Sequence, residues 1–179
     1  MPVLQIIYAP NPIFRKTAQA VTSIDQQVKQ NIDNMLATLE FEKAVGIGAN
    51  MVGLLQRLVV IDLKENGVSK PLCLINPKIV WRSESMQTFE EASLCFPGIS
   101  AEITRPDAVH IKYLNREGVG QELEAIGFLA TVIQHEMDYL DGKIFLDHLS
   151  KMKRDLLLAK MTKYIKAHPP HIHGQHCHH

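Results

Sequence analysis

The chain of 179 residues lacks several features that would place it in a specialised class of protein. It has three cysteines, Cys73, Cys95 and Cys177, and their odd number and irregular spacing exclude a disulfide framework and favour a reducing compartment. The longest apolar runs, such as 58–63, are far too short to cross a bilayer. No basic segment leads into an apolar stretch at the start, so we expect no signal peptide.

Net charge is also missing, because 19 basic residues balance 19 acidic residues. A neutral chain generates no overall field that would attract nucleic acid or an anionic membrane. We therefore predict a cytoplasmic protein with neither kind of partner.

What the chain does have is enough residues for one domain with a hydrophobic core, at 46% hydrophobic and 21% charged residues. Composition changes only at the end, which predicts a domain over 1–167 and a flexible, histidine-rich tail over 168–179. Histidines spaced by one to three residues chelate nickel, zinc or copper. A weak metal-binding tail and a tail without function both remain open.

Periodicity and turn residues predict an α+β order in which several strands precede a helix. Ser23 is a candidate N-cap for a first helix that ends before Gly46. Two further helices are expected over 128–140 and 150–167. The expected strands cover 57–62, 71–80, 88–102, 108–114 and 122–126.

The segment 134–142 carries the most chemical information. In metallohydrolases, the pattern His-Glu-x-x-His sets two imidazoles on one face of a helix, where both bind one metal ion. The glutamate then acts as general base on metal-bound water. Here His135 and Glu136 fit, but Tyr139 stands at the second histidine position. Taken alone, such a pair is more typical of a hydrogen-bonded structural contact.

The wider frame, Gln-His-Glu-x-Asp-x-Leu-x-Gly, resembles the third motif of the peptide deformylase family. Other segments resemble further parts of that family in the correct order, across about 165 residues and without gaps inside the two other motifs. These segments are 45–53 for the first motif, 90–98 for the second, and 7–12, 144–147 and 149–154 outside the motifs.

The resemblance implies a deformylase-like fold: antiparallel or mixed sheets around a central helix that carries the histidine and glutamate, plus N-terminal and C-terminal helices. Deformylases remove the formyl group from the N-terminal methionine of new polypeptides. They use one divalent metal, usually iron, zinc or nickel, and relatives are usually monomers. The same resemblance makes peptide N-termini the expected partner.

Carried over residue by residue, the resemblance assigns His135 to a metal-ligand position and Glu136 to the general-base position. The backbone N–H of Leu94 takes the oxyanion-stabilising position of the second motif. These three positions keep the chemistry that the family needs.

Three other positions do not keep the residue that the family uses there. Ser93 replaces the cysteine ligand, Tyr139 replaces the second histidine ligand, and Met51 replaces the oxyanion glutamine. A thiol loses its proton near a pKa of about 8.5, tyrosine only near about 10, and a serine hydroxyl is less acidic still. Because strand residues two apart share a face, Cys95 is a candidate substitute thiolate; an inert buried thiol is the alternative.

The family's pocket for the methionine side chain implies a set of mostly apolar positions here, for which a surviving pocket and ordinary core packing both stay open. These positions are Val45, Gly46, Phe89, Phe128, Thr131 and Val132.

The leading hypothesis is thus a deformylase-like protein with impaired or absent catalysis, whose metal is absent or weakly bound. One alternative is an active hydrolase with an altered metal site. Another is a metal-handling protein that acts through its histidine-rich tail. Metal content and hydrolysis of a formylated peptide distinguish them.

Overall fold

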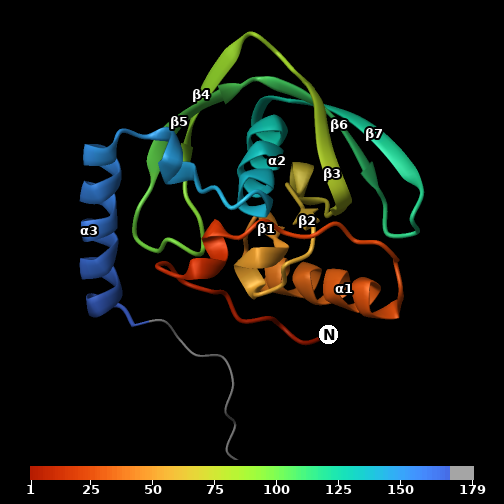
Figure 1. Ribbon diagram of the computed structural model, residues 1–179, viewed down its shortest axis with the longest axis horizontal. Helices are drawn as coiled ribbons and strands as arrows, with labels where there is room; N and C mark the ends of the chain where they lie inside the picture. Colours follow the sequence, from red (N-terminus) through yellow and green to blue (C-terminus); the bar gives the residue numbers. More distant parts are fainter. Residues whose placement is uncertain (170–179) are drawn as a thin grey trace, which may run out of the picture.

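A central helix, α2 (Gly127–Leu140), organises the computed structural model, which describes residues 1–169. Figure 1 shows this helix between two β-sheets, and α2 contacts strands of both. The α+β class predicted from the sequence is confirmed. Of the predicted tail, only residues 168 and 169 lie within the described residues.

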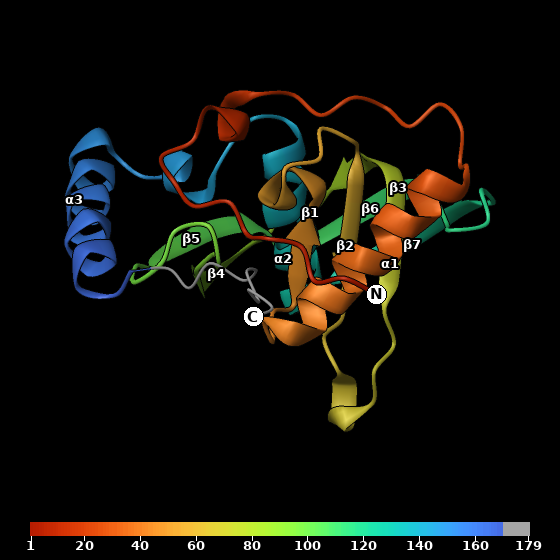
Figure 2. The same cartoon turned by 90° about the horizontal axis from the view of Figure 1, so that it is seen from below.

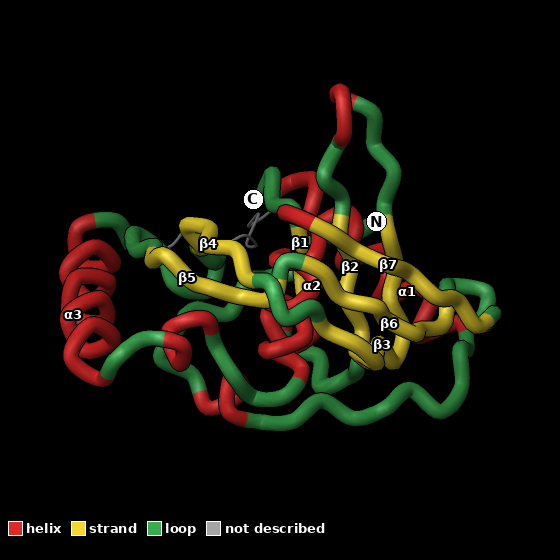
Figure 3. Tube along the Cα trace, turned by 90° about the horizontal axis from the view of Figure 1, so that it is seen from above, coloured by secondary structure: helices red, strands yellow, loops and turns green. Residues whose placement is uncertain are grey.

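Every pair of strands is antiparallel, and all pairs join consecutive strands except β3 with β6, between which the chain forms β4 and β5. The larger sheet has the order β1-β2-β3-β6-β7, and the smaller sheet pairs β4 with β5, as the tube in Figure 3 shows. The strand bounds are Gly46–Gly48 (β1), Leu58–Ile61 (β2), Leu72–Arg82 (β3), Met86–Glu91 (β4), Ala101–Pro106 (β5), Ala108–Leu114 (β6) and Gly120–Ile126 (β7).

The first helix, α1 (Gln26–Phe41), packs on β1 and β2 through an apolar face that includes Val28, Ile32 and Met35. The N-cap expected at Ser23 was wrong. Asp25 caps the helix, because its carboxylate accepts the N–H of Val28 at 2.9 Å.

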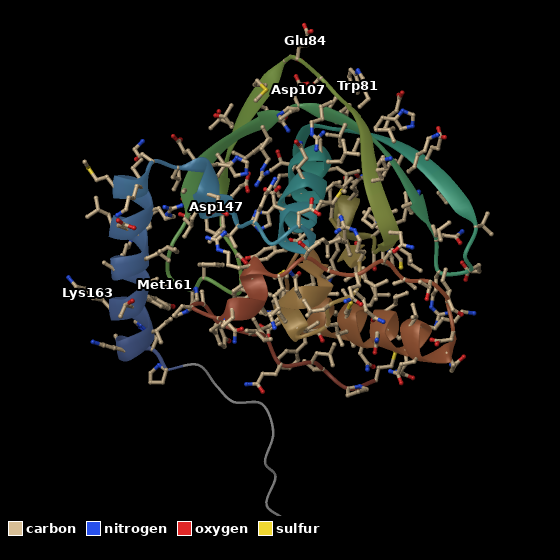
Figure 4. All side chains as sticks on the ribbon, viewed as in Figure 1. Trp81, Glu84, Asp107, Asp147, Met161 and Lys163 are labelled. Atoms are coloured by element: carbon tan, nitrogen blue, oxygen red, sulfur yellow. The ribbon has the colours of Figure 1, made fainter. Side chains whose placement is uncertain are left out.

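The last helix, α3 (Lys151–Ala167), lies at one edge of the domain (Figure 1). Met161 is its buried residue, and Figure 4 shows its side chain pointing towards the domain while Lys163 points away. The ring of Tyr164 covers Gly98, and His168 stacks on Tyr164 with 4.4 Å between ring centroids. None of the helices within residues 1–169 combines the length and apolarity that a membrane span requires.

The N-terminal segment, residues 1–25, runs across one side of the domain before α1, as Figure 2 shows, and is called the strap below. The N–H of Ile7 donates to the carbonyl of Met51, and the N–H of Ala9 donates to the carbonyl of Cys95, both at 2.9 Å. These bonds tie the strap to two segments that border the candidate site.

Candidate functional site

Helix α2 presents one face to a pocket of about 580 Å³. Phe128, Thr131, Val132 and His135 follow the spacing of one helical face, which explains why all four line the pocket. Most of the other residues predicted for the site line it too: Val45, Gly46, Met51, Ser93, Leu94 and Glu136.

Two of the predicted residues do not line the pocket. Phe89 packs against Phe128, which does line the pocket, with 5.5 Å between ring centroids. Tyr139 lies one turn beyond His135 and is fully buried. It therefore takes part in the site only through the groups that it touches.

The hydroxyl of Ser93 and the phenol of Tyr139 form a hydrogen bond of 2.6 Å. Burial, together with the neighbouring Cys95 and Glu136, raises the pKa of Tyr139 well above its ordinary value. The phenol accordingly keeps its proton at physiological pH. The two hydroxyl groups are thus paired with each other.

Ser93 and Cys95 lie in a turn, and the continuous strand expected over 88–102 was wrong. Strand β4 ends at Glu91 and β5 begins at Ala101, while the N–H of Phe96 donates to the carbonyl of Ser93 at 3.1 Å. The turn nevertheless brings the Cys95 thiol beside Tyr139. Cys95 is fully buried, and burial raises the pKa of its thiol far above the ordinary value.

The Nδ1–H of His135 donates to the carboxylate of Glu91 at 2.7 Å. A carboxylate only accepts, so this bond places the proton on Nδ1 and leaves Nε2 as an acceptor in the neutral ring. Arg105 in turn grips Glu91 with two bonds, from Nε at 2.8 Å and from a terminal nitrogen at 2.9 Å. The imidazole is therefore held in one orientation.

Burial alone would raise the pKa of Glu91, but the hydrogen bonds from His135 and Arg105 outweigh it, so the pKa lies below the ordinary value. Sequence reasoning did not single out Glu91 or Arg105 as site residues. The available signal was alternation in β5, which puts Arg105 on the same inward face as the buried Ile103. A charged residue at a strand position that faces the core indicates a buried partner of opposite charge.

The same arginine extends the network away from the pocket. A terminal nitrogen of Arg105 donates to Asp138 at 2.8 Å, and His148 contacts the same carboxylate oxygen at 3.0 Å. A chain of charged and polar groups thus runs from the half-exposed His148 through α2 to His135.

Glu136 lies on the pocket wall with 4% of its surface exposed, and its Oε2 has no hydrogen-bond partner in the described part of the chain. Burial raises its pKa, which His135 and an N–H of Gly48 partly oppose. Gly46 is needed beside it, because a Cβ there would lie 3.0 Å from the Glu136 carboxylate. The Oδ1 atom of Asn50, also near Gly48, is the second such unpartnered atom.

Met51 is buried in the short 3₁₀ helix Ala49–Val52 and lines the pocket. Its sulfur accepts the N–H of Gly48 at 3.3 Å. A thioether has no N–H to donate, so this position offers nothing to a developing oxyanion.

At His135, Ser93 and Tyr139, the three positions predicted from the sequence as ligand positions, the donor set is one imidazole nitrogen and two paired hydroxyls. Within residues 1–169, no three His, Cys, Asp or Glu side chains are arranged to hold a metal ion. Neutral hydroxyls are poor ligands for iron or zinc compared with a thiolate and imidazoles. The residues present therefore do not fit a tightly bound catalytic metal.

Comparison with known proteins gives a consistent assignment. The sequence model of the polypeptide deformylase family matches residues 3–155. A protein of Rickettsia conorii named "Peptide deformylase-like" is 58% identical over 99% of this chain and 97% of its own length. A peptide deformylase of Bartonella tribocorum is 38% identical, with 93% and 95% covered.

Solved structures agree with the sequence relatives. The peptide deformylase of Ehrlichia chaffeensis in complex with actinonin superposes with a TM-score of 0.87 at 32% identity, over 95% of this chain and all of that one. The enzyme of Legionella pneumophila gives 0.87 at 33% identity, with 94% and 99% covered. The chain therefore belongs to the peptide deformylase family.

Proposed function

We propose that this member of the family binds peptide N-termini in the inherited pocket and has lost efficient deformylation. The hydrogen bond of 2.6 Å between Ser93 and Tyr139 carries this proposal, because both groups stand at positions where the family uses metal ligands. One hydroxyl donates to the other, so both are engaged in this bond. Neither hydroxyl is therefore available as a free, deprotonated metal ligand.

The energetic cost of losing the metal is large. A catalytic metal lowers the pKa of its bound water to about 7, far below that of bulk water, and losing this effect forfeits on the order of 12 kcal/mol of activation as an upper bound. Loss of the oxyanion donor at Met51 adds roughly 3–4 kcal/mol. Glu136 remains at the general-base position, and a base alone does not offset such losses.

Retention of the pocket supports a binding role. Its walls are mostly apolar side chains, including Val45, Phe128 and Val132, and it is open to solvent at one side. A concave, apolar site of this size suits the side chain of an N-terminal methionine and the first residues after it. The 58% identical relative also has the qualified name "Peptide deformylase-like".

The experiment that tests the proposal measures metal content and hydrolysis of formyl-Met-Ala-Ser on the same preparation. We expect far less than one equivalent of iron, zinc or nickel in the domain and no turnover above background after adding each metal. One firmly held equivalent together with brisk cleavage would contradict the proposal and favour an active enzyme with an altered metal site.

A further inference from the structure

The pocket, if it binds peptides as proposed above, is surrounded by an excess of hydrogen-bond acceptors. The Nδ1–H of His135 donates a hydrogen bond to Glu91, and in this tautomer Nε2 carries a lone pair on the opposite side of the ring. Ser93 contributes a hydroxyl oxygen, and Glu136 contributes a carboxylate. All three side chains line the same pocket.

Charge around these acceptors is unbalanced in the same direction. Two buried carboxylates, those of Glu91 and Glu136, line the pocket, and the guanidinium beside Glu91, that of Arg105, is already shared with Asp138 outside the pocket. Arg105 pairs with Glu91 and Asp138, and Glu136 makes no ion pair within residues 1–169.

The mouth of the pocket does not correct this imbalance. Lys43 and Glu90 both line it and their charges are opposite, so they cancel to a first approximation. Buried carboxylates in proteins are normally paired with a cation or several donors. Among the described residues that line the pocket, the one lysine or arginine is Lys43, and it is exposed at the mouth.

We propose that the pocket prefers peptides whose N-terminal residue is apolar and carries a free α-ammonium group. An ammonium has one positive charge and three N–H donors, which match Glu136, Nε2 of His135 and the oxygen of Ser93 in number and in sign. A formylated N-terminus is neutral and brings one N–H and a carbonyl oxygen, which would face other acceptors.

The preference follows from the side chains that replace the ligands. A divalent ion in the pocket would oppose an ammonium group and attract a formyl oxygen. Where hydroxyl groups take its place, the local charge changes sign. The favoured ligand class is therefore the product of the family's reaction, a deformylated peptide with its methionine in place.

Titration calorimetry on the full chain tests this inference with Met-Ala-Ser, formyl-Met-Ala-Ser and acetyl-Met-Ala-Ser. We expect the free amine to bind at least tenfold more tightly than either blocked peptide. Equal or tighter binding of the formyl peptide would overturn the ammonium preference and leave the proposed peptide binding intact. Failure of all three peptides to bind at millimolar concentration would overturn the proposed function itself.

A substitution at Glu136 tests whether its carboxylate causes the preference for the free amine. Glu136→Gln keeps the shape of the side chain and removes its charge, so the preference for the amine should shrink to threefold or less. Glu84→Gln is the matched control, because Glu84 is exposed beyond the end of β3, at the tip of the connection to β4 (Figure 4), and does not line the pocket. An unchanged preference in folded Glu136→Gln would contradict the assignment. The three-peptide comparison on the unaltered chain decides the matter if that variant does not fold.

Discussion

Ser93 and Tyr139 are joined by a hydrogen bond of 2.6 Å that links the turn after β4 to the central helix α2. Forty-five residues intervene between them in the chain, so the bond is a tertiary contact and not a local one. If it stands in for a metal, restoring the ligand types should restore metal binding.

The double variant Ser93→Cys with Tyr139→His should hold close to one equivalent of zinc or iron, because it recreates a thiolate and two imidazoles around the pocket. Elemental analysis should use a chain ending at Ala167, since the histidine-rich end binds metals by composition. Each single variant serves as a control and should hold much less. A double variant that folds yet stays metal-free counts against our account of the site.

Tyr139→Phe should lower the free energy of unfolding by about 1–2 kcal/mol, because it removes the hydrogen bond to Ser93 while it keeps the ring in the core. Denaturant unfolding measures the loss. A double-mutant cycle with Ser93→Ala isolates the pairwise term. Strictly additive losses in that cycle would show that the two hydroxyls do not act together.

Acid should destabilise the domain through Glu91. Its pKa is lowered in the folded state, so its contribution to stability is present above the unfolded pKa of about 4.3 and is lost as the pH falls through the lower folded value. Glu91→Gln should remove this part of the pH dependence. It should also cost about 3 kcal/mol or more at pH 7, because Arg105 loses its main partner.

Unfolding free energies between pH 2 and pH 7 measure both effects. Glu90→Gln is the neighbouring control, since Glu90 is exposed and its carboxylate accepts a hydrogen bond from the hydroxyl of Ser100. If Glu91→Gln kept the slope of the parent chain below pH 4, the network would not have the role that its geometry indicates.

Gly98→Ala should loosen α3. A Cβ at Gly98 would lie 2.2 Å from the ring of Tyr164, and its φ of +78° already disfavours other residues. Hydrogen exchange should accelerate in α3 and stay unchanged in α1 and α2. Gly120→Ala is the control, because nothing lies within 4 Å of a Cβ there. If the hydrogen-exchange protection of α3 were the same in Gly98→Ala, the contact between Tyr164 and Gly98 would not hold α3 in place.

Regular elements with clear periodicity were predictable from the sequence. The helix expected over 128–140 is found at Gly127–Leu140, and the strand expected over 108–114 is found at Ala108–Leu114. Those segments have one continuous periodicity, which local reasoning detects. The family assignment came from spaced motifs and is supported over nearly the whole chain.

The turn at Ser93 was not predictable in the same way, because its alternating pattern resembles a strand and its conformation depends on tertiary bonds such as that to Tyr139. Arg105 was overlooked for a related reason: its partners Glu91 and Asp138 are distant in sequence. The roles of the site residues, the cytoplasmic location and the monomeric state stay predictions.

Two side chains that contact each other are part of the polypeptide, whereas a metal ion has to be bound from solution after synthesis. If the bond between Ser93 and Tyr139 replaces the ion, the integrity of this domain no longer follows the supply of iron or zinc. Such a protein would persist unchanged in a cell starved of transition metals or treated with chelators, conditions under which metal-dependent relatives lose their centre.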